Sequence, residues 1–111
     1  MPSNTEVIDY GSGLNVYGAL RSRTTGQFWN GAAMEAYQDA HWSTYAVTMP
    51  ETGTSGIYLF TAPAALPVDI YDLLVKQRLG GSAALTDSGI WSLSETWDGG
   101  QLLPMARRNG R

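Results

Sequence analysis

Few side chains of this chain are suited to acid–base or nucleophilic chemistry. His41 is the single histidine, and it follows Glu35 and Asp39 in a segment that also contains tyrosine and tryptophan. A serine nucleophile needs a base within hydrogen-bond reach and a third group that orients the base. The sequence contains no Gly-x-Ser-x-Gly. We therefore expect His41 to be a packing or surface residue rather than a catalytic one.

Two pairs of carboxylates are the other catalytic candidates, because paired acidic side chains can hydrolyse a glycosidic bond. The pairs are Glu35 with Asp39 and Glu95 with Asp98, and a tryptophan lies near each pair in the sequence. Acidic residues beside aromatic ones are common on any acidic domain. A glycosidase also usually needs a larger cleft than a β-sandwich of 111 residues offers. We therefore predict that the chain is not an enzyme, and we keep a small glycan hydrolase as a less favoured alternative.

Metal and cofactor sites lack their usual ligands. The chain has no cysteine, so disulfides and thiolate metal sites are excluded, and a single histidine leaves no histidine pair for zinc. The Asp-x-Asp-x-Asp-Gly pattern of a calcium loop is absent. Gly11-Ser12-Gly13 lacks the lysine and the helix of a phosphate-binding loop. We expect no metal and no cofactor.

Charge is divided unevenly along the chain. Residues 1–104 carry four basic and ten acidic side chains, a net charge of −6, whereas residues 105–111 carry +3 through Arg107, Arg108 and Arg111. An acidic body argues against a nucleic-acid-binding face. The basic tail is either a solvated terminus or a segment that docks on an acidic partner or a neighbouring copy. No apolar run approaches the ~18 residues that a membrane span requires, and the first residues lack the pattern of a signal peptide, so we expect neither membrane insertion nor export.

Glycine and proline punctuate short runs of β-branched and aromatic residues, which is typical of a sandwich or a barrel. We predict an all-β, Ig-like antiparallel β-sandwich of about six or seven strands, with a possible short helical turn near residues 33–41. Residues 1–13 are predicted to be an N-terminal lead-in, 14–104 the β-sandwich domain and 105–111 a basic C-terminal tail. The expected strands cover 14–21, a run starting at 27, 42–49, 57–62, 68–79, 88–94 and 101–105.

Aromatic residues are the one enriched class of side chain, with four tryptophans, six tyrosines and two phenylalanines. Alternation in the longest predicted strand places Tyr71, Leu73 and Val75 on one face, with Leu79 as a possible fourth member. At least two tryptophans should fill the core, since one aromatic side chain buries a large area. Exposed aromatic residues mark either sugar-stacking platforms or protein–protein contacts. We predict that Trp29 and Trp97, together with the three arginines of the tail, bind a partner.

Several blocks resemble a known group of proteins. They are Gly26-Gln27-Phe28-Trp29-Asn30-Gly31, Glu35-Ala36-Tyr37, Trp42-Ser43-Thr44-Tyr45-Ala46-Val47, Glu51-Thr52-Gly53-Thr54-Ser55-Gly56-Ile57-Tyr58, Pro63, and Tyr71-Asp72-Leu73-Leu74-Val75. Together they resemble the small Ig-like accessory domains of tailed-bacteriophage structural modules, over roughly residues 14–93. The Trp-x-x-Tyr-Ala block is the most specific part of the resemblance, and residues 94–111 are outside it.

The resemblance implies a virion structural protein without enzymatic activity, assembled in the cytoplasm of the host bacterium. Capsid decoration (cement) protein is the first expectation, and a small component of the neck or tail is the second. The implied partners are other virion proteins, with the chain present as a homo-oligomer or in many copies that add up weak contacts. The alternative is a carbohydrate-binding β-sandwich module that uses exposed tryptophans.

Overall fold

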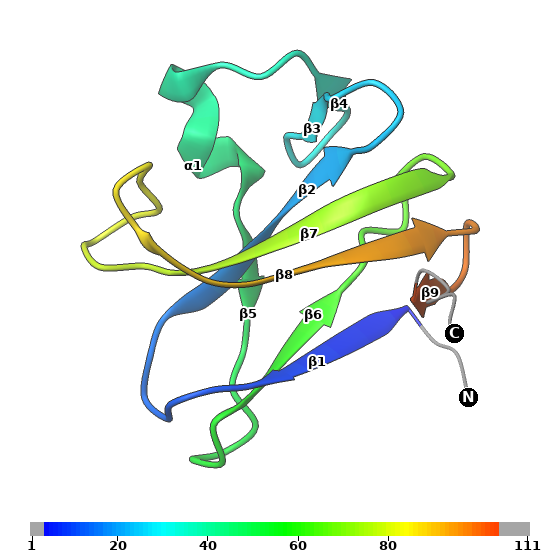
Figure 1. The fold of residues 1–111 in the computed structure, drawn as a ribbon. Helices are drawn as coiled ribbons and strands as arrows, with labels where there is room; N and C mark the ends of the chain where they lie inside the picture. The colour runs from blue at the N-terminus through cyan, green and yellow to red at the C-terminus, as the bar shows by residue number, and fades with distance from the viewer. Residues whose placement is uncertain (1–3, 105–111) are drawn as a thin grey trace.

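The computed structural model describes residues 4–104, and nearly all of its regular structure is antiparallel β-sheet (Figure 1). A 3₁₀ turn, η1 (Asp39–His41), leads directly into one short helix, α1 (Trp42–Tyr45). The strands within these residues are β1 (Thr5–Asp9), β2 (Val16–Ser22), β3 (Phe28–Trp29), β4 (Met34–Glu35), β5 (Val47–Met49), β6 (Ile57–Thr61), β7 (Asp69–Gln77), β8 (Ser88–Trp97) and β9 (Leu102–Pro104).

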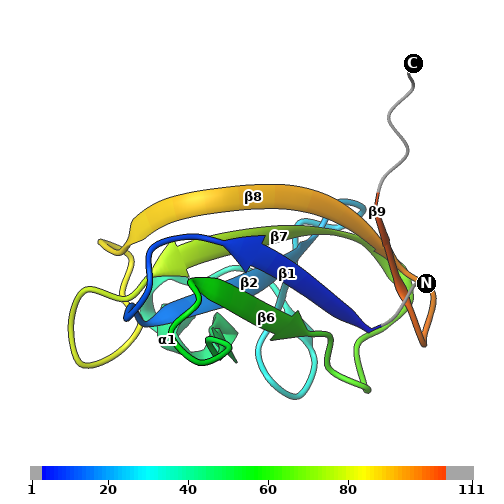
Figure 2. The same ribbon diagram turned by 90° about the horizontal axis from the view of Figure 1, so that it is seen from below.

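Two antiparallel sheets form a compact sandwich, which confirms the predicted all-β sandwich. The main sheet has the strand order β4-β3-β2-β7-β8-β9, with β5 paired to β2 as well. The second sheet is the pair β1 and β6, which runs from Thr5 opposite Thr61 to Asp9 opposite Ile57. An isolated bridge between Glu51 and Tyr58 ties the end of β5 to β6. Figures 1 and 2 show β1 and β6 lying together on one face of the main sheet.

Both faces of the main sheet are covered, because β2 carries buried residues on both of its faces. Toward β1 and β6, the larger core includes Leu20, Phe60, Tyr71 and Leu73. On the opposite face, α1 covers a smaller cluster made of Tyr17, Ala19, Phe28, Trp42 and Tyr45. The predicted face is confirmed for Tyr71, Leu73 and Val75, which are all buried, but not for Leu79, which lies beyond the end of β7 and is exposed.

The N-terminal segment is more structured than predicted. Residues 1–13 were expected to be a polar lead-in, but Thr5–Asp9 forms β1. The reason is that Ile8 is buried in the larger core while Val7 and Asp9 face outward, so even this short polar run alternates with period two. The predicted edge strand near residues 101–105 is found as β9 within the described residues.

The segment predicted as a strand over 42–49 is partly helical. Only Val47–Met49 is a strand, and Trp42–Tyr45 forms α1. Three-residue spacing brings Trp42 and Tyr45 to the same side of a helical turn, where both are buried against β2. The helical turn expected near 33–41 is found at the end of that range as η1, which continues into α1, whereas Met34–Glu35 is a strand.

Gly56 has the most restrictive backbone position. Its φ is +79°, and a Cβ there would overlap the backbone oxygen of Tyr10. Gly13 has a similar φ of +81° but open space around it. We expect Gly56→Ala to lower the free energy of unfolding by about 2 kcal/mol or more, and Gly13→Ala by about 1 kcal/mol from backbone strain alone. Urea unfolding of both variants checks this, and equal losses would contradict the close approach of Tyr10 to Gly56.

Candidate functional site

A polar cluster joins β4 to the helical segment, and it contains two of the residues considered as catalytic candidates, Glu35 and His41. The Glu35 carboxylate accepts hydrogen bonds from the Tyr45 hydroxyl at 2.6 Å and from the Asn30 amide at 2.9 Å. His41 Nδ1 lies 2.8 Å from the same carboxylate. Asp39 is exposed and lies beside Tyr37 instead. The candidate pair of Glu35 and Asp39 is therefore not formed, and Glu35 is surrounded by donors.

We call Glu35 and its three partners, Asn30, His41 and Tyr45, the clamp, because their hydrogen bonds hold β4 to the helical segment. The hydrogen bond from Tyr45, with those from Asn30 and His41, lowers the pKa of Glu35 to about 2, and so weak a base is a poor proton acceptor. Within residues 4–104, Glu35 is the sole hydrogen-bond partner of the His41 ring. The nearby Thr44 hydroxyl donates to the His41 backbone oxygen rather than to the ring. A nucleophile, a base and an orienting group do not come together here.

The lowered pKa of Glu35 predicts an acid-dependent loss of stability. Because the folded carboxyl titrates below its ordinary value, its contribution is complete above the unfolded pKa of about 4.5 and disappears as the pH falls toward 2. We expect the stability difference between the native chain and Glu35→Gln to shrink across that range. Chemical unfolding measured at several pH values checks this, with Asp39→Asn as the control. A difference that does not change with pH would contradict the clamp.

The second candidate pair, Glu95 with Asp98, is also not formed. The Asp98 carboxylate accepts hydrogen bonds from the backbone N–H groups of Gly100 and Gln101, so it closes the turn between β8 and β9. Glu95 is buried on the inner face of β8, where its carboxyl lies beside that of Glu6; two ionised carboxylates cannot donate to each other, so the pair forms a hydrogen bond only when one of them holds a proton. Burial and the neighbouring Glu6 raise the pKa of Glu95 to about 8. Glu95 is thus an uncompensated acid inside the core.

The predicted partner-binding tryptophans are corrected by the structure. Trp29 is 3% exposed and Trp97 is 2% exposed, so both belong to the core, and the Trp97 indole donates to the backbone oxygen of Leu66. Trp42 is buried as well, and Trp91 alone among the four is exposed, at 60%. One tryptophan cannot make the several-ring platform on which the carbohydrate-binding alternative depends. The other predicted partner-binding residues, Arg107, Arg108 and Arg111, lie outside the described residues.

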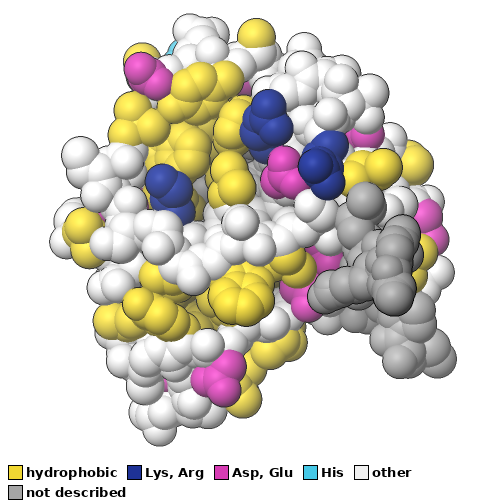
Figure 3. Space-filling view, in the orientation of Figure 1, with side chains coloured by type: hydrophobic (Ala, Val, Ile, Leu, Met, Phe, Trp, Pro, Cys, Tyr) yellow, Lys and Arg dark blue, Asp and Glu magenta, His cyan; other side chains and the backbone are white. Residues whose placement is uncertain are grey.

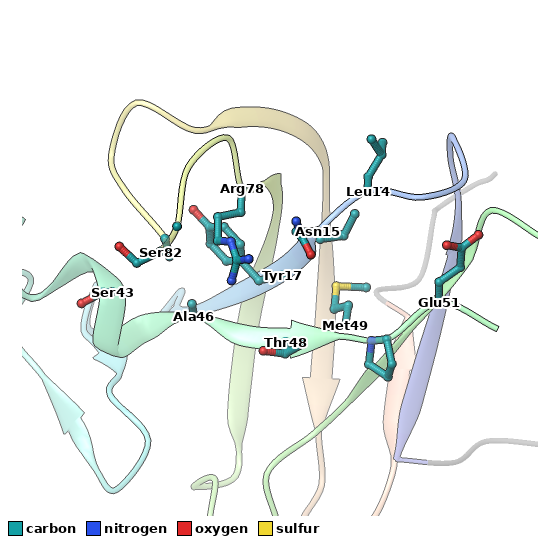
Figure 4. A pocket seen from close by; sticks show the side chains of 14 residues that line it. Leu14, Asn15, Tyr17, Ser43, Ala46, Thr48, Met49, Glu51, Arg78 and Ser82 are labelled. Carbon is teal, nitrogen blue, oxygen red and sulfur yellow. The ribbon is translucent and has the colours of Figure 1, made fainter. Parts of the chain in front are cut away.

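An open pocket of about 420 Å³ lies between β2, β5 and the loop that follows β7 (Figure 4). Arg78 reaches into it from the end of β7, and its Nε is buried without a hydrogen-bond partner among the described residues. Hydroxyls of Ser43, Thr48 and Ser82 line the pocket. The Glu51 carboxylate is held at the far side by the backbone N–H groups of Gly13 and Gly56. These side chains offer a cation and several hydroxyls, but no nucleophile paired with a base.

A second hollow, a groove of about 370 Å³, separates β1 from the first part of β8. The space-filling view shows hydrophobic side chains gathered in the region between these two strands (Figure 3). The most exposed are Trp91 at 60%, Val7 at 52% and Tyr10 at 45%. Ile90 and Leu93 line the same groove from β8, while Glu6 and Asp9 line it from β1. The groove therefore combines apolar side chains with acidic ones.

The two strands that border the groove each have an edge without a described neighbour. β8 pairs with β7 along its whole length, but with β9 only through residues 95–97. β1 pairs with β6 alone. The uncovered part of β8 has the sequence Ser-Gly-Ile-Trp-Ser-Leu-Ser, which contains no charged residue and no proline. Natural edge strands normally carry charged residues or proline, because these prevent pairing with other chains. A β-bulge near Ile90 is the feature that interrupts this edge.

The sequence predicted Trp91 within a strand and Val7 and Tyr10 within a lead-in, and it did not predict that these three side chains border one groove. The available signal was the uncharged run 88–94, in a chain whose body is strongly acidic.

Within the range 4–104, no group of three or more histidine, cysteine, aspartate or glutamate side chains is arranged to hold a metal ion. No helix of that range is long and apolar enough to cross a membrane. Comparisons with protein families, with curated proteins and with solved structures found no match.

Proposed function

We propose that the chain is a non-enzymatic structural domain that joins neighbouring subunits through the uncovered edge of β8 and the groove beside it. The single observation that carries the proposal is the seven-residue uncharged edge, centred on a tryptophan that is 60% exposed. Backbone groups on such an edge favour pairing with an extended segment, and the apolar side chains of the groove add burial.

The chemistry of the groove indicates what kind of segment it takes. Glu6 and Asp9 line the side formed by β1, and residues 1–104 carry a net charge of −6. An extended segment with basic side chains therefore complements the groove in charge. Apolar or small residues on alternate positions would face Leu93 and Trp91.

The biological setting that we propose is a virion. Its support is the resemblance of residues 14–93 to accessory domains of tailed-bacteriophage structural modules. Capsid decoration is the preferred role, and a neck or tail position is the second. In either role many copies are arrayed, so that a modest contact at each groove is multiplied by avidity. The chain would then be assembled in the cytoplasm of the host bacterium.

The test compares two exposed apolar residues. Trp91 lines the groove, whereas Leu79 is 59% exposed and lies outside it. Native mass spectrometry at increasing protein concentration should show oligomers of the native chain and of Leu79→Ser, and fewer of Trp91→Ser. Both variants should keep the melting temperature of the native chain, since neither side chain is in the core. Equal oligomer fractions for Trp91→Ser and Leu79→Ser would contradict the proposal.

A further inference from the structure

Arg78 is the one basic side chain of residues 4–104 that has neither an acidic nor an aromatic partner. The two other arginines of that range form ion pairs with Asp72 at 3.4 Å, and the Lys76 ammonium lies 5.0 Å from the centre of the Trp42 ring. Acidic side chains are abundant in this part of the chain, with ten for every four basic ones. Arg78 nevertheless pairs with none of those described, so its charge can act on a ligand.

The pocket between β2, β5 and the loop after β7 presents one edge of the Arg78 guanidinium. Nε is the single nitrogen of this group that is both buried and unpartnered within the described residues, so the two Nη groups form the edge that solvent reaches. Figure 4 shows the side chain pointing into the pocket next to Tyr17. Two parallel N–H groups on one edge of a guanidinium match the two oxygens of a carboxylate.

The rest of the pocket combines hydroxyl groups with apolar walls. Ser43, Thr48 and Ser82 are exposed, and within residues 4–104 their hydroxyls have no hydrogen-bond partner. Leu14 and Met49 contribute apolar surface to the same pocket. A ligand that carries one charged group and a small apolar body therefore finds a matching surface for each of its parts.

The carboxylates of the surrounding segments are already engaged by other donors of the chain. Asp87, in the loop after β7, accepts hydrogen bonds from the Tyr17 hydroxyl at 2.7 Å and from two backbone N–H groups. Glu51, at the far side of the pocket, is ionised, because hydrogen bonds led by that from the Gly13 N–H lower its pKa. An anionic group is repelled by Glu51 and attracted by Arg78, which orients the ligand.

We propose that this pocket binds a small monocarboxylate with a short apolar body, whose carboxylate accepts hydrogen bonds from the Arg78 Nη groups. One cation balances one negative charge, whereas a phosphate dianion would add further charge to a body of −6. The volume of about 420 Å³ suits a small molecule. The pocket shares no lining residue with the β1–β8 groove, so the site goes beyond the proposed function and does not depend on it.

The experiment titrates the isotopically labelled full chain with sodium butyrate and follows the backbone amide chemical shifts. We expect saturable shifts in the millimolar range at Ser43, Thr48 and Ser82, and no shifts along residues 88–94. Arg78→Gln should weaken the binding about ten-fold or more, because the charge-assisted contact is lost. Arg21→Gln removes the same charge from an exposed side chain outside the pocket, and it should change the Kd by less than about two-fold.

A second variant keeps Arg78 and its packing in place. Ser82 is exposed, so Ser82→Glu should keep the melting temperature of the native chain while placing a carboxylate inside the pocket. That carboxylate repels butyrate and competes with it for Arg78, so binding should weaken about ten-fold or more. Thr54→Glu is the matched control, because Thr54 is exposed and lies outside the pocket. It should bind butyrate as the native chain does.

Titrations with 1-butanol and with inorganic phosphate decide the ligand chemistry, and both should bind more weakly than butyrate. Butanol that binds as tightly as butyrate would overturn the contact with Arg78. Phosphate that binds more tightly would overturn the assignment of a monocarboxylate. Failure of butyrate to saturate the native chain, or equal affinities for the native chain, Arg78→Gln and Ser82→Glu, would overturn the site. Since these measurements follow the pocket alone, their failure would leave association at the groove unaffected.

Discussion

Replacement of Tyr71 by alanine is expected to lower the free energy of unfolding by about 3–5 kcal/mol, as large-to-small substitutions of buried aromatic residues do. Tyr71 lies at the centre of β7, with no exposed surface, and packs in the larger core. Its hydroxyl donates to the Pro67 backbone oxygen at 2.6 Å, and burial raises its pKa to about 12, so the donor stays protonated. Alanine would remove the ring and leave a cavity between the two sheets.

Tyr71→Phe separates the ring from the hydroxyl. It keeps the packing and leaves the Pro67 oxygen without that donor, so we expect a loss of about 1–2 kcal/mol. Exposed Leu85 provides the control, since Leu85→Ala should change stability little. Denaturant unfolding of the three variants is the measurement. A Tyr71→Ala chain as stable as the native chain would show that the buried face of β7 is assigned wrongly.

Replacement of Glu95 by glutamine is expected to stabilise the chain at neutral and higher pH. The folded-state pKa of about 8 exceeds the ordinary value of 4.5, so the folded state holds its proton more tightly than the unfolded state. Stability is therefore complete below about 4.5 and decreases as the pH rises through about 8. Because one pKa unit corresponds to about 1.4 kcal/mol, the shift of Glu95 from 4.5 to about 8 corresponds to a loss of about 4 kcal/mol of stability near pH 8. Glutamine has a similar shape and carries no such proton linkage.

The test of this prediction is the pH profile of the difference between two chains. The gain in unfolding free energy of Glu95→Gln over the native chain should be small near pH 4.5 and grow toward pH 8. Glu6→Gln is the matched variant, because it removes the neighbouring carboxylate that adds to the effect of burial. It should reduce the pH dependence without abolishing it. A gain that is constant with pH would contradict an uncompensated acid at this position.

The alternation of apolar residues predicted the sheet architecture and the buried face of β7, but it could not predict which parts of a face are covered. Trp91, Leu93, Glu95 and Trp97 all face the same side, opposite Val75, Leu73, Tyr71 and Asp69. Exposure nevertheless changes from 60% at Trp91 to 2% at Trp97. The cause is tertiary: β9 covers the end of β8 and leaves its first part open. Period-two patterns assign faces, whereas burial depends on neighbours that are distant in sequence.

The candidate site was predicted less well for a related reason. From the composition we expected no catalytic set. The exposed surface, in contrast, depends on β1, whose sequence Thr-Glu-Val-Ile-Asp contains only two apolar residues. Glu35 was considered from the sequence only as half of a carboxylate pair with Asp39, and its observed partners include Asn30 and Tyr45, which the sequence did not connect to it. The helical turn of α1 brings Tyr45 back to β4, and spacing along the chain does not reveal that return.

The most direct test of the central claim, that subunits meet at the β1–β8 groove, is amide hydrogen exchange on associated and monomeric chain. We expect association to slow amide exchange at residues 5–10 and 88–94 and to leave the exchange rates around the Arg78 pocket unchanged. Slowing at the Arg78 pocket with no change along β1 and β8 would contradict it. Failure of the native chain to associate at any concentration would contradict it as well.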